Sequence, residues 1–198
     1  MTPTVEPFFH RPSGTLSYLV HHGDDAVIID PVLNLDVVSG TISAAPSDDI
    51  AARASELGVR VHWVLDTHAH ADHISGAHYL ARALDAKLGM GRGIRQVHAT
   101  FAPVFNDDAQ APAPFDTLFE DGATCAAGAL TVKVMCTPGH TDDSVTYRIG
   151  DAAFVGDTLF APARGTARCD FPGGSARALF DTIQRLYALP EGTRLYLC

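Results

Sequence analysis

The sequence has little positive charge and lacks any long hydrophobic run. Its 198 residues include 14 Lys and Arg against 23 Asp and Glu, so the formal net charge is −9 at pH 7. A protein that binds nucleic acid needs clustered cations to neutralise the phosphates, so this balance argues against a nucleic-acid partner. No segment reaches the roughly 18 apolar residues that a membrane-spanning helix needs, so we expect no membrane partner either.

Cysteine is scarce, and the sequence contains no Cys-x-x-Cys pair. The four cysteines are Cys125, Cys136, Cys169 and Cys198. Residues 1–12 hold Pro, Glu and His where a secretory signal peptide needs an apolar core. We therefore expect reduced thiols and a cytoplasmic protein.

No low-complexity tract, internal repeat or polar linker divides the sequence. A chain of 198 residues is long enough to bury one core, so we expect a single domain over residues 1–198. Short apolar runs alternate with helical patterns, and several runs are joined by tight turns. This order is typical of mixed sheets with helices on their outer faces.

The expected strands and helices follow from the spacing of apolar residues, and Gly and Pro indicate where they end. The expected strands are residues 16–20, 26–29, 59–65, 86–90, 130–136, 144–149, 152–155 and 193–198. The expected helices are residues 47–57 (with Ser47 as N-cap and Gly58 as C-cap), 74–84, 94–100 and 175–189. Residues 21–25 are expected to form a hairpin turn, and residues 102–114, which contain three prolines, a loop.

Potential metal ligands crowd into one short segment. His68, His70, Asp72 and His73 lie within six positions, directly after the expected strand 59–65. Imidazole nitrogens and carboxylate oxygens suit Zn²⁺ or Fe²⁺, and a loop at a strand end lets neighbouring side chains converge. A solvated loop with chance histidines is the alternative, but four potential ligands at this density favour a metal site.

Two further segments carry potential ligands at strand ends. His140 lies in Thr-Pro-Gly-His-Thr after strand 130–136, where Pro and Gly predict a sharp turn. Asp157 lies in Gly-Asp-Thr after strand 152–155. An Asp at a strand end is usually a turn former, so each signal is modest alone. Together the three segments indicate one site.

In this order, the three segments resemble the motifs of the metallo-β-lactamase superfamily. Asp30, after strand 26–29, also fits that family's early Ile-Asp element. The resemblance covers nearly the whole chain. It implies an αββα sandwich, in which two mixed β-sheets are flanked by helices and the metal site lies at one edge between the sheets.

Residues 165–171, Gly-Thr-Ala-Arg-Cys-Asp-Phe, indicate which group within the superfamily the sequence resembles most. They are similar to the Gly-Cys-Gly-Arg-Thr-Asp-Phe segment of the persulfide dioxygenases, and the bacterial β-lactamase-like hydrolases and glyoxalase II are related. Thr166, Ala167 and Cys169 depart from that segment. Arg168 is therefore a candidate either for binding a substrate carboxylate or for a structural pair with Asp170. Cys169 is the one cysteine expected near the site.

Persulfide dioxygenases hold one Fe²⁺ through the residues that match His68, His140 and Asp157. The resemblance implies a non-haem iron dioxygenase that uses O₂ to oxidise glutathione persulfide, or a related low-molecular-weight persulfide, to sulfite. The partners would then be a small thiol or persulfide and O₂, and His140 would be a catalytic candidate. The family also favours a homodimer.

The alternative is a zinc-dependent hydrolase of a thioester or ester, similar to glyoxalase II. Its ligands would be His68, His70 and His140 for one Zn²⁺, and Asp72, His73 and a histidine after Cys198 for the other, with Asp157 bridging. Asp72 is the catalytic candidate here, because it would orient a water whose pKa the metal lowers towards about 7. A non-catalytic domain is a third alternative, against which the intact iron ligands argue.

The resemblance predicts more chain beyond the last residue. In the family, the final strand runs into Gly-His-Asp-Tyr or Cys-His-Asp-Tyr, and this sequence stops at Cys198. We therefore expect a domain that lacks its C-terminal segment. The iron ligands are all present in it, whereas the two-zinc ligand set is incomplete.

Overall fold

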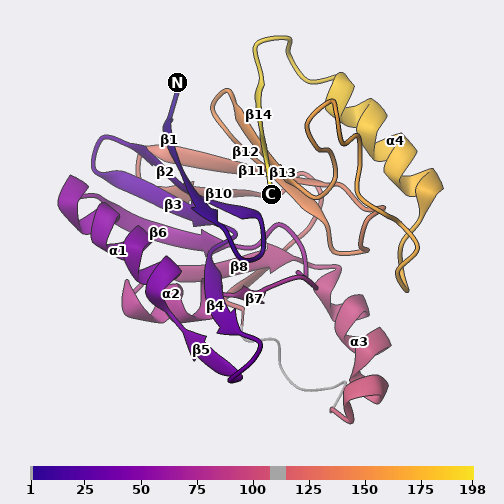
Figure 1. The fold of residues 1–198 in the computed structure, drawn as a ribbon. Helices are drawn as coiled ribbons and strands as arrows, with labels where there is room; N and C mark the ends of the chain where they lie inside the picture. Colours follow the sequence, from indigo (N-terminus) through magenta and orange to yellow (C-terminus); the bar gives the residue numbers. More distant parts are fainter. Residues whose placement is uncertain (1, 108–114) are drawn as a thin grey trace.

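The computed structural model describes residues 2–107 and 115–198, in which two β-sheets face each other with helices outside them (Figure 1). The first sheet has the order β1-β2-β3-β6-β8-β9. Its strands are Thr4–His10 (β1), Thr15–His22 (β2), Asp25–Ile29 (β3), Arg60–Leu65 (β6), Lys87–Gly91 (β8) and Thr117–Phe119 (β9). The outer strands β1 and β2 are antiparallel neighbours, whereas β3, β6, β8 and β9 run parallel.

The second sheet has the order β10-β11-β12-β13-β14. Its strands are Thr124–Ala127 (β10), Leu130–Cys136 (β11), Val145–Ile149 (β12), Ala152–Gly156 (β13) and Arg194–Leu197 (β14). A small third sheet projects from the body of the molecule and consists of Val32–Asp36 (β4), Thr41–Ser43 (β5) and Ile74–Ser75 (β7).

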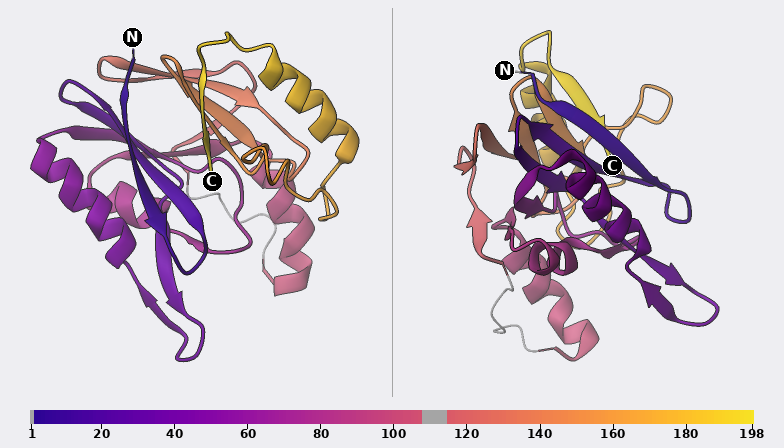
Figure 2. Two further views of the ribbon diagram at one scale, coloured as in Figure 1. Left: turned by 45° about the horizontal axis from the view of Figure 1, so that its top comes forward. Right: turned by 90° about the vertical axis from the view of Figure 1, so that its left-hand side faces the viewer.

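Helices flank the two sheets (Figure 2), and one of them, Ile94–Phe105, projects beyond the sandwich. They are Ala45–Leu57 (α1), Ala77–Ala83 (α2), Ile94–Phe105 (α3) and Ala176–Tyr187 (α4). The pair α1 and α2 lies beside the first sheet and α4 beside the second, so the described chain confirms the expected αββα sandwich. None of the described helices is long and apolar enough to cross a bilayer.

Strand alternation produces two separate hydrophobic cores. On β2 and β3, Val20 and Val27 face the second sheet, where they pack with Val132 and other residues of β11. Their neighbours Leu19 and Ile28 face the opposite way and pack against α1 and α2. Because successive side chains of a strand point to opposite faces, one strand contributes to both cores. This packing holds the strand ends, and the loops that follow them, in fixed positions.

Several expected element boundaries were wrong. Helix α1 begins at Ala45, so Ser47 is not its N-cap; the Ser47 hydroxyl is buried and donates to the Val32 carbonyl oxygen at 2.9 Å. Gly58, at φ 68°, is the left-handed C-cap as expected. The helix expected from residue 74 begins at Ala77, because residues 74–75 pair with β4.

Two connections also differ from the prediction. Helix α3 continues to Phe105 through Pro103 and ends at Asn106, in the left-handed conformation, where a loop over 102–114 was expected. Residues 108–114 of that expected loop lie outside the described residues. In the first hairpin, His21 and His22 belong to β2, where they pair with β3, so the turn is shorter than expected.

Candidate metal centre

Three strand ends bring the predicted ligands together. His68 follows β6, His140 follows β11 and Asp157 follows β13, so the donors come from both sheets. One ligand atom from each of the three lies within 4.8 Å of the others. The Asp157 carboxylate Oδ2 is 3.8 Å from His68 Nε2 and 3.6 Å from His140 Nε2. Both imidazoles are buried, and the carboxylate is partly exposed.

A second group combines the remaining predicted ligands. One ligand atom each from His70, Asp72 and His73 also falls within 4.8 Å of the others. His73 Nδ1 is 3.3 Å from both an Asp72 carboxylate oxygen and the Thr15 hydroxyl. Its other nitrogen, Nε2, is buried and has no hydrogen-bond partner within the described residues. A buried nitrogen of this kind is expected where an ion binds, so these residues fit a metal.

Asp30 fixes the loop that carries these ligands. Its carboxylate accepts hydrogen bonds from the Thr67 amide at 2.6 Å and the Thr67 hydroxyl at 2.9 Å, and lies 3.3 Å from His70 Nε2. Asp30 itself adopts a left-handed backbone with φ 49°. Such a conformation is unusual for a non-glycine residue and is common near functional sites.

Burial and hydrogen bonds shift the pKa values of these side chains in different directions. Burial, followed by repulsion from neighbouring histidines, holds the pKa of His68 well below its usual value, so His68 is neutral and able to bind a metal. Burial also raises the pKa of Asp157. A hydrogen bond to His73 lowers the pKa of Asp72 to about 2, so that carboxylate is ionised.

His70 has a second partner that the sequence did not indicate. Burial would lower the His70 pKa, but hydrogen bonds to Asp30 and to the Cys198 thiol raise it well above its usual value. Burial in turn raises the pKa of Cys198 to about 12. Cys198 therefore also lies beside the site, and the expectation that Cys169 is the one cysteine near it was wrong. The family resemblance carried a signal for this position, because it places a ligand histidine directly after Cys198.

Two buried aspartates support the loop and were not predicted. Asp143, three residues after His140, accepts a hydrogen bond from the Ala69 amide at 2.7 Å. Asp66 accepts one from the Ser75 hydroxyl at 2.7 Å, and burial raises its pKa to about 7. The positions of these carboxylates, directly before and after the histidine motifs, are the only sequence signal that could have indicated them.

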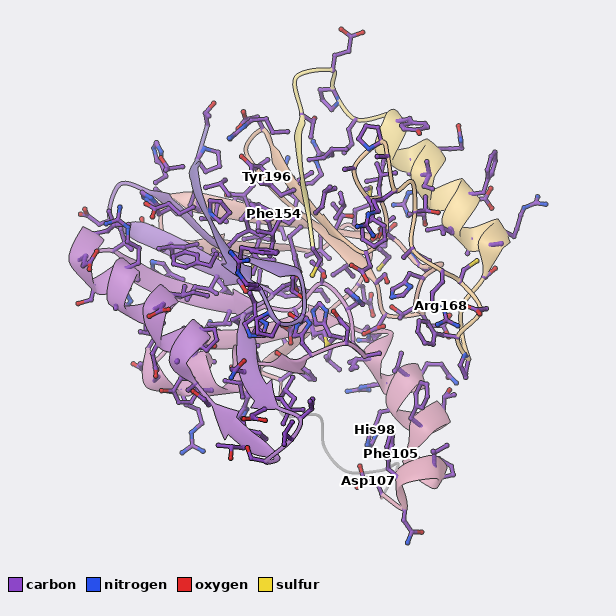
Figure 3. The ribbon with its side chains drawn as sticks, viewed as in Figure 1. His98, Phe105, Asp107, Phe154, Arg168 and Tyr196 are labelled. Atoms are coloured by element: carbon purple, nitrogen blue, oxygen red, sulfur yellow. The ribbon has the colours of Figure 1, made fainter. Side chains whose placement is uncertain are left out.

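Arg168 lies on the long connection between β13 and α4 (Figure 3). Its guanidinium donates to both carboxylate oxygens of Asp170, at 2.6 and 2.7 Å, and both side chains are exposed. The predicted pair with Asp170 is therefore present. A contact between Arg168 and a substrate stays a prediction.

A sequence profile described as the metallo-beta-lactamase superfamily matches residues 10–196. A probable metallo-hydrolase of Burkholderia pseudomallei is 44% identical and aligns over 98% of this chain and 71% of its own length. The human mitochondrial persulfide dioxygenase ETHE1 is 33% identical over 97% of this chain and 66% of its own length. The chain spans only 46% of the length of the beta-lactamase hydrolase-like proteins of Xylella fastidiosa and Agrobacterium fabrum, to which it is 42–43% identical.

Solved structures share the same architecture. The crystal structure of ETHE1 from Myxococcus xanthus aligns with a TM-score of 0.77 and 30% sequence identity. The alignment covers 98% of this chain and 74% of that chain. The sandwich architecture is therefore common to both proteins.

Proposed function

Because the chain belongs to the metallo-β-lactamase superfamily, we propose that it is a non-haem iron dioxygenase that oxidises a low-molecular-weight persulfide. The favoured substrate is glutathione persulfide. One persulfide, one O₂ and one water yield the thiol, sulfite and two protons. The similarity to human persulfide dioxygenase supports this assignment.

The observation that carries the proposal is the grouping of His68, His140 and Asp157. Two histidines and one carboxylate are the ligand set of non-haem iron oxygenases, which leave further positions of the ion open. When bound, Fe²⁺ supplies the redox chemistry that lets O₂ react with a sulfur atom. These three residues would hold one ion per chain.

The chain's own residues prepare this set before any ion binds. Thr67 contacts His68 Nδ1 at 3.0 Å, and the Arg168 carbonyl oxygen lies 2.7 Å from His140 Nδ1. With Nδ1 occupied on each ring, both Nε2 atoms are directed at Asp157. In this proposal, Arg168 is also the candidate for binding a substrate carboxylate.

A zinc-dependent hydrolase is the second candidate, and the second ligand group favours it. The unpartnered His73 Nε2, with His70 and Asp72 beside it, supports a second metal position next to the first. Zinc would lower the pKa of a water in such a site. Asp72, ionised at neutral pH, would orient that water towards a thioester carbonyl.

Parallel reconstitution separates the two functions. The protein is loaded anaerobically with Fe²⁺ or with Zn²⁺; O₂ uptake and sulfite are measured with glutathione persulfide, and hydrolysis is measured with a glutathione thioester. We expect uptake with iron only, lost in His140→Ala and kept in His78→Ala, which changes an exposed histidine of α2. Thioester hydrolysis with zinc and no uptake with iron would move the assignment to the hydrolase.

A further inference from the structure

The connection between β13 and α4 reaches back to His140. The Arg168 carbonyl oxygen lies 2.7 Å from His140 Nδ1. A carbonyl oxygen can only accept, so Nδ1 carries a proton, and in the neutral ring the lone pair is on Nε2. That lone pair faces Asp157, 3.6 Å away. The tautomer and the aim of His140 therefore depend on where this one carbonyl is held.

Three side chains surround the peptide that bears the carbonyl. The Arg168 guanidinium bonds both Asp170 oxygens, which closes a ring across Cys169. The same guanidinium lies over the Phe171 ring, 4.7 Å from its centroid. The Phe171 ring in turn meets His140, with centroids 5.5 Å apart and planes at 78°. The His140 imidazole is thus contacted twice by one short loop, by the Arg168 carbonyl oxygen and by the Phe171 ring.

The far end of this loop is attached to the turn that carries His140. The Gly174 amide donates to the Phe171 carbonyl oxygen at 2.7 Å, and the Ser175 amide donates to the Gly139 carbonyl oxygen at 2.8 Å. A Cβ added at Gly174 would collide with the Cys169 carbonyl oxygen. The loop is therefore tied to the turn at both ends, and the exposed Arg168–Asp170 pair adds a side-chain closure in its middle.

We propose that Arg168, Asp170 and Phe171 form a clamp that fixes the tautomer and orientation of His140, with Arg168 as a positioning residue. This inference rests on the proposed role of His140 as a metal ligand. A planar guanidinium matched to a carboxylate by two parallel hydrogen bonds holds one geometry, which an ammonium group does not. An exposed ion pair contributes little to folding, so we expect its removal to change global stability little.

The test compares Arg168→Lys, Asp170→Asn and Arg168→Ala with a matched control. The control is Arg177→Ala, which removes another exposed Arg–Asp pair, Arg177–Asp181 at 3.6 Å on α4. Two quantities are measured: the exchange rate of the His140 Nδ1 proton by NMR in metal-free protein, and the Zn²⁺ dissociation constant by chelator competition. We expect faster proton exchange and about tenfold weaker zinc binding in all three clamp variants, and wild-type values in the control.

Unchanged exchange and unchanged zinc affinity in Arg168→Lys and Asp170→Asn would overturn the proposal. If Arg168 instead binds the substrate, Arg168→Ala raises KM while zinc affinity and proton exchange keep their wild-type values. Asp170→Asn and Arg168→Lys keep side chains of similar size, so they serve where Arg168→Ala does not fold. The proton readout needs neither metal nor substrate; it decides the clamp even where the wild type fails to bind zinc and the proposed function falls.

Discussion

At the scale of single residues, the site is organised by side chains that hold the ligands in place. Asp30 illustrates this, because its two oxygens accept hydrogen bonds from the Thr67 amide and hydroxyl and one of them contacts His70. Asp143 does the same for the Ala69 amide. Such partners commonly affect metal affinity by 10–100-fold although they never touch the ion.

Replacing Asp30 tests this support. Asp30→Asn keeps the shape but removes one acceptor oxygen and the charge beside His70. We expect zinc affinity to fall by about tenfold or more and stability to fall by about 1–3 kcal/mol, because a buried donor loses its partner. Calorimetric titration and urea unfolding measure the two effects. Asp24→Asn, in an exposed turn, is the control; equal effects in both variants would contradict the assigned role.

The reactivity of the Cys125 thiol is a measure of how well that side chain is buried. Burial raises the pKa of Cys125 to about 11, so its reactive thiolate form is scarce at pH 8. Because the folded-state value lies above that of a free thiol, the thiolate appears only as the pH rises towards 11. We expect mass spectrometry to find Cys125 unmodified by iodoacetamide at pH 8 in folded protein and modified after unfolding. Rapid labelling at pH 8 would contradict this.

At the scale of elements, turns present the ligands at the right place. Gly139, at φ 142°, precedes His140, and a Cβ there would collide with the backbone of Leu179 on α4. A left-handed, closely packed position of this kind admits glycine alone. The turn is therefore shaped for contact with α4 as well as for presenting His140.

Adding one methyl group at this turn should disturb both roles. We expect Gly139→Ala to lower stability by at least about 1–3 kcal/mol, through backbone strain and collision with α4, and to weaken zinc binding. Differential scanning calorimetry and zinc titration measure these effects. Gly192→Ala is the control, because a Cβ there meets nothing within 4 Å. A stable Gly139→Ala variant with normal zinc affinity would show that the turn tolerates a side chain.

Elements with clear patterns could be predicted, and short or irregular ones could not. Strand β11 alternates apolar and polar residues and was predicted to the residue, and Ser175 caps α4 where the helix was expected to begin. The edge strand β1 contains Pro7 and two adjacent apolar residues, Phe8 and Phe9, so its sequence lacks a regular strand alternation although the strand pairs fully with β2. Likewise, residues 74–75 continue a helical pattern, and only tertiary pairing with β4 makes them a strand.

At the scale of the whole molecule, the candidate ligands come from both sheets. His68 follows a strand of the first sheet, and His140 and Asp157 follow strands of the second. Motif order could suggest this convergence, because strand ends of an α/β fold meet at one edge. The positions of Asp66 and Asp143 beside the histidine motifs are a sequence signal, but their hydrogen-bond partners could not be predicted, because those bonds depend on how the chain folds back.

A metal that bridges the sheets should stabilise the fold. At about 100 times its dissociation constant, Zn²⁺ stabilises the native state by about 2.7 kcal/mol. For a chain of this size, that corresponds to a rise in melting temperature of roughly 5–11 °C. Thermal melts with Zn²⁺ and with chelator measure it. In His140→Ala, most of the zinc-induced rise in melting temperature should be lost, whereas His78→Ala should keep the full rise. Equal rises in both variants would indicate that zinc binds elsewhere.

The division of the ligands between two sheets also bears on when the metal is acquired. During synthesis, the segment with four ligand candidates emerges first, but its partners His140 and Asp157 follow only after most of the chain. The triad is therefore complete only once both sheets have paired. We expect the finished fold, and not the nascent chain, to capture the ion, so the metal content reflects the ions available where the protein completes folding.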